Sequence, residues 1–229
     1  MDRQFERVIN VLGEEGLRKL NASTVMVIGL GGVGGICAES LARSGVGTMI
    51  LADFDVVDPS NLNRQILATA STVGKKKTEA MKGRLLEICP GLNVITVDLR
   101  ITEENAGVLF GLKPDYVIDA IDSLPAKVEI WKLCQENGVP FIASLGMARR
   151  LDPTKVRETV LNKTTGDPMA RKLRYMARNK GLDLNIPVVF STEEAMEVKD
   201  GVLGSMMFVP SAAGLALASA CVRYLTDKK

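Results

Sequence analysis

The sequence of 229 residues contains no histidine. Without histidine the chain cannot form a Ser-His-Asp or Cys-His nucleophile, use a histidine general base or bind a metal ion through imidazole. Aromatic residues make up only 4% of the chain, so aliphatic side chains must fill most of the core. We therefore expect its chemistry to depend on carboxylates, lysine, arginine and bound ligands.

Cysteine is also scarce, and its four positions are widely separated: Cys37, Cys89, Cys134 and Cys221. None of them belongs to a Cys-x-x-Cys pair, the spacing typical of zinc sites and redox motifs. The segment MDRQFERVIN at the start is charged where a secretory signal would have an apolar core. We expect reduced, mostly buried thiols in a cytoplasmic protein.

Only one hydrophobic stretch, residues 202–225, approaches the ~20 apolar residues of a membrane span. Ser205, Pro210 and Ser211 interrupt this stretch, and its many alanines suit close packing against another element. We expect a core or interface helix from about Ser211 to Tyr224, without stable membrane insertion.

β-branched runs alternate with helical patterns between residues 23 and 145, which predicts repeated βαβ units and a parallel sheet. The expected strands are 24–29, 48–53, 93–98, 115–121 and 140–145, and the expected helices are 33–43, 75–88 and 124–137. A helical arm over residues 5–20, broken near Gly13, precedes them. Beyond residue 150 we expect strands at 156–161 and 187–191 and a basic helix at 168–179.

The predicted fold class is therefore α/β: a Rossmann-like, mostly parallel doubly wound sheet with an N-terminal helical arm and a small C-terminal α+β lobe. Residues 1–150 and 151–229 are expected to be two parts of one globular unit.

A glycine-rich loop, Gly29-Leu30-Gly31-Gly32-Val33-Gly34, joins the first expected strand to the first expected helix. In this context glycines allow a tight turn and bring backbone N–H groups close to a phosphate at a helix N-terminus. The candidate phosphate-binding positions are Gly29, Gly31, Gly32 and Gly34. Asp53 ends the next strand 19 residues after Gly34, at the spacing where a carboxylate meets ribose hydroxyls. Both ATP and NAD satisfy this pattern.

The polar segment after Asp53 distinguishes between these nucleotides. Residues 55–65 read DVVDPSNLNRQ, and a lysine run at 75–77 then opens a helix. Cleavage of ATP between its α- and β-phosphates concentrates negative charge on the leaving pyrophosphate, which needs fixed cations and an orienting polar group. Asn61, Arg64 and Lys77 supply such groups, and a dehydrogenase has no use for them. The lysine run taken alone is typical of a solvated helix start.

These motifs resemble the ubiquitin-activating-enzyme-like adenylating superfamily, of the ThiF and MoeB type, over roughly residues 5–145. The resemblance implies an ATP site in which Asp53 contacts ribose and Asn61, Arg64 and Lys77 contact phosphates. It also implies that Arg7, in the N-terminal arm, reaches the γ-phosphate, often that of a dimer mate.

Two carboxylates, Asp119 and Asp122, lie at the end of the fourth expected strand, where doubly wound sheets bind ligands. The resemblance implies that Asp122 binds magnesium. Asp119 is equally suited to accept hydrogen bonds from loop N–H groups. The catalytic residues implied are Arg7, Arg64, Lys77 and Asp122.

Residues 149–180 contain ten Lys or Arg against three Asp or Glu, a net charge of +7 that leaves −5 for the rest of the chain. This asymmetry indicates a local footprint for a polyanion, although the total charge of only +2 excludes a uniformly basic surface. Arg171, Arg174 and Arg178 recur at helical spacing and share one face of the basic helix. The alternative is an exposed helix without a partner.

Further segments resemble the tRNA threonylcarbamoyladenosine dehydratase branch of this superfamily over nearly the whole chain. They are LGEEGL at 12–17, ARSGVG at 42–47, DAIDS at 119–123, GDPMAR at 166–171 and GSMMFVP at 204–210. The resemblance implies ATP-dependent adenylation of the threonyl carboxylate of the modified adenosine next to the anticodon, followed by ring closure through the carbamoyl group. It implies ATP and Mg²⁺ as cofactors, a homodimer, and a sulfur-transfer protein as an associate. With tRNA as the substrate, we expect the basic helix to bind its phosphates through Arg171, Arg174 and Arg178, because these residues share one helical face.

The alternative function is adenylation of the C-terminal glycine of a ubiquitin-like sulfur-carrier protein by an enzyme of the same fold. Such enzymes commonly have paired zinc cysteines and often a loop cysteine, and this sequence has neither. A tRNA-binding module without catalysis is disfavoured because the matched nucleotide positions are chemically competent. An NAD dehydrogenase is disfavoured because no residue serves hydride transfer.

Overall fold

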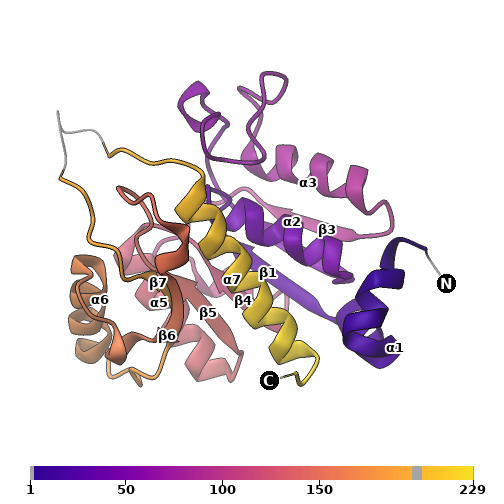
Figure 1. Cartoon of the computed structure of the whole chain (residues 1–229). Coiled ribbons are helices and arrows are strands. Elements are labelled where there is room, and N and C mark those ends of the chain that lie inside the picture. Colours follow the sequence, from indigo (N-terminus) through magenta and orange to yellow (C-terminus); the bar gives the residue numbers. More distant parts are fainter. Residues whose placement is uncertain (1–2, 198–202, 229) are drawn as a thin grey trace.

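The computed structural model describes residues 3–197 and 203–228 of the chain. The remaining residues, among them Val202 at the start of the apolar C-terminal stretch, lie outside the described residues. Figure 1 shows a central sheet with helices packed on it. Within the described residues the sheet has seven strands in the order β3-β2-β1-β4-β5-β7-β6. Their bounds are β1 Thr24–Ile28, β2 Thr48–Ala52, β3 Asn93–Val97, β4 Tyr116–Asp119, β5 Phe141–Ser144, β6 Val156–Val160 and β7 Pro187–Ser191.

The strand order reverses beside β1, which pairs in parallel with β2 on one side and with β4 on the other. All neighbouring strands run parallel except β6, which is antiparallel to β7. In an open parallel sheet, ligands bind beyond the carboxyl ends of the strands where the order reverses. The glycine loop follows β1 and therefore lies at this point.

Helices cover both faces of the sheet. One face packs against α1 (Glu6–Ala22), α2 (Gly34–Ser44), α3 (Lys77–Ile88) and α7 (Phe208–Leu225). The other face packs against α4 (Gly107–Phe110), α5 (Leu124–Asn137) and α6 (Pro168–Asn179). Strand side chains alternate between the two cores: Val25 and Val27 belong to the first, and Met26 and Ile28 to the second. The parallel strands are consequently apolar on both faces.

Local sequence signals explain several helix ends. α6 begins after Asp167, whose Oδ1 accepts hydrogen bonds from the N–H groups of Met169 and Ala170 at 2.7 and 3.0 Å. α2 ends at Ser44 and is capped by Gly45, which adopts a left-handed φ of +94°. The helical arm is kinked at Gly13, where φ is +79°, as the sequence predicts.

The expected strands and the helices through residue 191 begin and end within two residues of the observed ones. α7 differs: it begins at Phe208, about one turn before the expected start at Ser211. Pro210 lies in this first turn, where its missing N–H group has no intrahelical partner to lose. The expected start at Ser211 was wrong, because a proline is tolerated in the first turn and the helix begins before it.

By length and composition α7 also qualifies as a membrane-spanning helix. In the described structure α7 packs against α2 and the sheet, and 44% of the helix is buried. The expected lack of membrane insertion stays a prediction.

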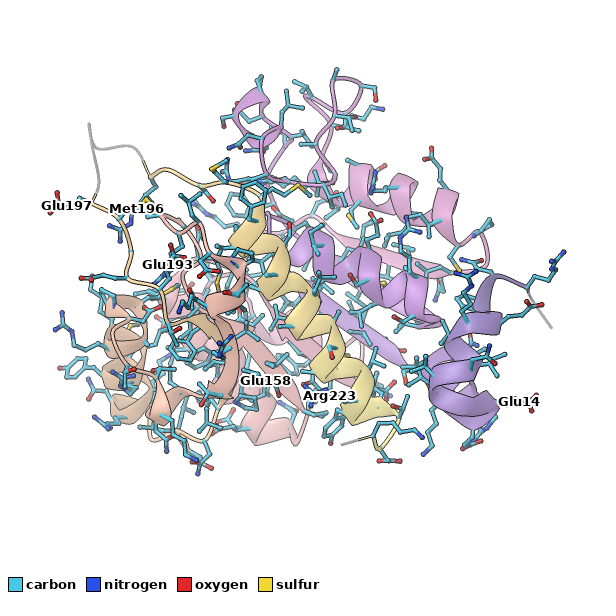
Figure 2. All side chains as sticks on the ribbon, in the orientation of Figure 1. Glu14, Glu158, Glu193, Met196, Glu197 and Arg223 are labelled. Atoms are coloured by element: carbon cyan, nitrogen blue, oxygen red, sulfur yellow. The ribbon has the colours of Figure 1, made fainter. Side chains whose placement is uncertain are left out.

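The segment after residue 150 extends the same sheet, because β7 pairs with β5 through Ala143 and Val188. Figure 2 shows Arg223 of α7 beside Glu158 of β6, with which it forms a salt bridge on this part of the sheet. The division of the chain into residues 1–150 and 151–229 stays a prediction.

Candidate functional site

The glycine loop turns tightly after β1. Gly29 has a φ of +88°, and a Cβ placed on it would lie 2.8 Å from the carbonyl oxygen of Ala120. A Cβ on Gly34 would lie only 1.8 Å from the carbonyl oxygen of Gly29. A Cβ on Gly31 would meet nothing closer than Gln65 Nε2, at 4.0 Å. The fold therefore requires glycine at positions 29 and 34, whereas the open space at Gly31 is free for a ligand at the N-terminus of α2.

Asp53 connects the end of β2 to the glycine loop. Its Oδ2 accepts a hydrogen bond from the Leu30 N–H at 2.7 Å, and its Oδ1 accepts one from the Asp55 N–H at 2.9 Å. The carboxylate thus lies beside the loop at the position where dinucleotide folds bind ribose. A ribose contact by Asp53 stays a prediction.

Lys77 opens α3 and has a side chain that is only 7% exposed. Its Nζ lies 2.7 Å from Asp55 Oδ2, and its N–H donates to the Asp55 carbonyl oxygen at 3.0 Å. Lys75 and Lys76 are exposed, as expected for a solvated helix start. The lysine run at 75–77 therefore contains two surface lysines and one buried lysine, Lys77. The buried lysine is held next to Asp55, two residues after Asp53.

The segment between β2 and α3 contains a 3-10 turn at Pro59–Asn61. Arg64 and Gln65, which follow this turn, lie beside the glycine loop. Asn61 is buried, and its Oδ1 accepts a hydrogen bond from the Asp58 N–H at 3.1 Å. Arg64 Nη1 donates to the Ser60 carbonyl oxygen at 2.9 Å. The carbonyl oxygen of Arg64 would lie 3.2 Å from a Cβ on Gly32, so a larger residue there would require this backbone to shift by a few tenths of an ångström.

The two carboxylates at the carboxyl end of β4 have opposite surroundings. Asp119 is fully buried: its Oδ1 lies 2.9 Å from Lys127 Nζ, and its Oδ2 accepts a hydrogen bond from Trp131 Nε1 at 2.7 Å. It also accepts one from the Ile121 N–H at 3.3 Å. Burial raises the pKa of the Asp119 carboxyl, and the ammonium of Lys127 opposes this rise. Asp119 therefore acts inside the protein, in agreement with its interpretation as an acceptor for loop N–H groups.

Asp122 is exposed and has no hydrogen-bond or ion-pair partner among the described residues. Gly29 closely approaches Ala120, so the turn that carries Asp122 lies next to the glycine loop. No three acidic or cysteine side chains converge on a metal-binding position in residues 3–197 and 203–228. One free carboxylate beside the candidate phosphate site fits Mg²⁺, which is commonly held by one or two carboxylates together with substrate phosphates.

Arg7 does not join this group within its own chain. It lies near the start of α1, where the ring of neighbouring Phe5 packs against Gly45, with 3.5 Å between the ring and a Cβ placed on that glycine. Gly45 ends α2, and the glycine loop lies at the other end of this helix. Because α2 has 11 residues, the two ends are about 16 Å apart. This separation is longer than an arginine side chain.

The arginines of α6 also differ from one another. Arg171 and Arg178 are exposed. Arg174 is half-buried, and its Nη1 donates to the carbonyl oxygens of Leu161 and Thr164 at 3.2 and 3.1 Å. The structure therefore uses Arg174 to hold the turn before α6, which spacing alone does not reveal. Phosphate binding by these arginines stays a prediction.

Two polar residues near the glycine loop, Gln65 and Ser211, are not among the site residues that the sequence predicts. Gln65 is buried, and its Oε1 has no hydrogen-bond partner among the described residues. The Ser211 hydroxyl, in the first turn of α7, is also buried without a partner there. Its neighbour Pro210 would lie 3.2 Å from a Cβ on Gly32. The sequence feature that could have identified Gln65 as a site residue is its position directly after Arg64 in the polar motif.

All four cysteines are buried, as expected. Burial raises the pKa of the thiols of Cys37, Cys134 and Cys221, which keeps them protonated at neutral pH. A protonated thiol is a poor nucleophile. These thiols are therefore unsuited to a thioester relay.

The sequence pattern of the ThiF family matches residues 2–229. The chain belongs to the ThiF family. The tRNA threonylcarbamoyladenosine dehydratase of Bacillus subtilis (strain 168) is 39% identical, over 95% of this chain and 92% of that protein. The protein of the same description from Escherichia coli (strain K12) is 37% identical, over 83% of this chain and 74% of its own length.

Among solved structures, that of the E. coli dehydratase TcdA in complex with ATP matches this chain with a TM-score of 0.92 and 34% identity, covering 99% of this chain and 95% of that one. This ThiF-family member therefore has the Rossmann-like α/β fold that its sequence predicts, and the superfamily resemblance is confirmed.

Proposed function

We propose that this chain uses ATP to adenylate the threonyl carboxylate of threonylcarbamoyladenosine in tRNA and then promotes its cyclisation. The observation that carries the proposal is the gathering of the glycine loop, Arg64, Lys77 and Asp122 at one edge of the sheet. The likeness to dehydratases over most of the chain supports this choice of substrate.

In the first step the threonyl carboxylate attacks the α-phosphorus of ATP, and pyrophosphate leaves. Arg64 and Lys77 oppose the charge that develops on the leaving group, and their positions are set before ATP binds by Ser60 and Asp55. Asp122 would hold Mg²⁺, which when bound neutralises charge on the phosphates. Asp53 binds the ribose.

In the second step the carbamoyl group of the same nucleoside attacks the acyl-adenylate carbon. AMP leaves, a ring closes, and the net change is loss of water. Because the nucleophile belongs to the same nucleoside, this step depends on positioning and needs no nucleophilic side chain of the protein. This agrees with a chain that has no histidine and whose cysteines are buried.

A homodimer completes the site in this proposal, because Arg7 lies too far from the glycine loop of its own chain. Val11 on α1 and Leu215 on α7 are 78% and 56% exposed, on helices that cover the same face of the sheet (Figure 1). Mixing Arg7→Ala and Asp122→Ala chains tests this arrangement. We expect each variant alone to be inactive and the mixture to recover part of the activity, and no recovery would contradict a site shared between chains.

The deciding experiment is ATP–pyrophosphate exchange with tRNA that carries the threonylcarbamoyl modification, with the same tRNA lacking it as a control. A sulfur-carrier protein with a free C-terminal glycine is assayed separately. We expect exchange only with the modified tRNA. Exchange with the carrier protein alone would favour the alternative function. A cytoplasmic location, which we expect from the scattered, unpaired cysteines, and a sulfur-transfer associate, which the family resemblance implies, are further parts of the proposal.

A further inference from the structure

The outer face of α6 combines an aromatic ring with cations. Tyr175 is 68% exposed, more than any other Phe, Tyr or Trp in the chain. The opposite face of the helix is buried through Ala170, Leu173 and Ala177. The helix thus has ample apolar contact without Tyr175, and the ring is not needed for its packing.

Three cations surround this ring. Arg171 precedes Tyr175 by four residues, Lys172 precedes it by three, and Arg178 follows it by three. Residues at these spacings are neighbours on a helix surface. All are exposed, and neither the Tyr175 hydroxyl nor the three cationic groups have a hydrogen-bond or ion-pair partner among the described residues. α6 itself contains no acidic residue.

Contacts on the inner side hold this surface in place. The Asp167 carboxylate caps the first turn, and Arg174 binds the turn before the helix. At the other end, Lys180 Nζ lies 2.5 Å from Glu129 Oε2 of α5 and 2.6 Å from Glu103 Oε1. Figure 2 shows other side chains of α6 projecting away from the body of the molecule. The ring and its cations therefore stand on a helix fixed at both ends.

The surface begins beside the edge of the sheet that carries the nucleotide site. Met169, in the first turn of α6, has its Sδ 3.6 Å from a Cβ placed on Gly146, which closely follows β5. A chain bound along α6 can therefore continue to the carboxyl ends of the strands.

We propose that Tyr175 is a stacking platform for an unpaired base of the RNA substrate, with Arg171, Lys172 and Arg178 binding the flanking phosphates. The inference rests on the proposed function. Unpaired RNA bases stack on exposed tyrosine rings and arginine planes, whereas the bases of a duplex already stack on one another. The surface therefore recognises a single-stranded RNA loop and not a helix.

Binding of an anticodon stem-loop RNA to the full chain tests this proposal, with a blunt RNA duplex of equal charge as the second probe. Tyr175→Ala is expected to weaken stem-loop binding about tenfold at every salt concentration, without a change in the log–log salt slope, because stacking is not electrostatic. Tyr175→Phe keeps the ring and is expected to bind like the wild type. Neither change is expected to alter duplex binding.

The matched control removes charge and keeps the ring. The double variant Arg171→Gln/Arg178→Gln is expected to flatten the salt slope by about 0.7–0.9 for each phosphate that the variant no longer neutralises. Equal weakening of stem-loop and duplex binding by Tyr175→Ala, or no weakening of either, would overturn the stacking platform. Binding to phosphatidylserine vesicles that depends on Tyr175 in the same way would indicate a membrane surface and would also overturn it.

The two proposals fail in different ways. If the wild-type chain shows no pyrophosphate exchange with modified tRNA, the proposed function fails whatever Tyr175 does. If the wild-type chain turns modified tRNA over and Tyr175→Ala has the same KM for it, only the stacking platform fails. We expect Tyr175→Ala to raise this KM and to leave the KM for ATP unchanged.

Discussion

Lys127 Nζ lies 2.9 Å from Asp119 Oδ1, and neither side chain is exposed to solvent. Removing two charges from water is costly, and the hydrogen bond from Trp131 Nε1 offsets part of that cost. The pair joins the end of β4 to α5, on either side of the turn that carries Asp122. The pair therefore supports the placement of the exposed Asp122 carboxylate and takes no part in the chemistry itself.

Lys127→Met is expected to destabilise the fold by about 3–5 kcal/mol, because it leaves the buried Asp119 carboxylate without its counter-ion. The free energy of unfolding in urea measures this loss. Lys132→Met, on the same helix but 37% exposed, is the control and is expected to cost about 1 kcal/mol or less. Equal stability of the two variants would show that Asp119 does not need its partner.

Asp122→Asn is expected to slow pyrophosphate exchange by at least about 100-fold, because the change removes the proposed Mg²⁺ ligand. Its melting temperature is expected to stay that of the wild type, since the side chain is exposed and unpartnered. Ser123→Ala, next to it, is the control for both measurements. Near-normal turnover of Asp122→Asn would assign the metal to another residue.

Two glycines of the loop are expected to respond differently to alanine. Gly34→Ala is expected to destabilise the fold, because its Cβ would overlap the carbonyl oxygen of Gly29. Gly31→Ala is expected to fold normally and to lose the stabilisation by ATP and Mg²⁺ in a thermal shift assay, since its Cβ would occupy open space beside the helix N-terminus. NAD is expected to stabilise neither the variant nor the wild type. Full ATP binding by Gly31→Ala would place the phosphates elsewhere.

Iodoacetamide is expected to leave the folded chain unmodified at neutral pH and its activity unchanged. All four cysteines are buried, and burial raises the pKa of the Cys37, Cys134 and Cys221 thiols. Mass spectrometry before and after unfolding in urea counts the reactive thiols. Inactivation that tracks the modification of one native cysteine would reopen the possibility of a covalent intermediate.

Glu129 is expected to contribute to the acid stability of the chain. Its hydrogen bond with Lys180 is the main reason that its pKa lies below the usual 4.5, and Lys132 adds to the effect. A lowered native pKa gives stability that is present above the unfolded value and lost as the pH falls through the native one. Glu129→Gln is therefore expected to cost about 1 kcal/mol at pH 7 and to flatten the decline in stability below about pH 4.5.

The control for this prediction is Glu136→Gln, on the same helix. Glu136 is 55% exposed and lies 3.8 Å from Lys132. We expect it to change neither the stability at pH 7 nor the acid decline. Identical urea midpoints for Glu129→Gln and the wild type from pH 3 to pH 7 would contradict the prediction.

The sequence by itself determined most of the elements, with the exception of α4 and the first turn of α7, and it determined the glycine loop that we propose to bind phosphate. Strands and helices were predictable because apolar periodicity and capping residues act over a few neighbours, as at Asp167 and Gly45. The glycine loop and Asp53 were predictable for the same reason, since they lie at fixed distances along one βαβ unit.

Only the tertiary structure decided which charged side chains are free. Asp119 and Asp122 are three residues apart and alike in sequence, but Lys127 and Trp131 bury the first and leave the second exposed. Arg174 is engaged by the turn at Leu161 and Thr164, while Arg171 on the same helix stays in solvent. Burial and partners come from residues brought together by folding, and their free energies depend on distances that spacing along the chain does not contain.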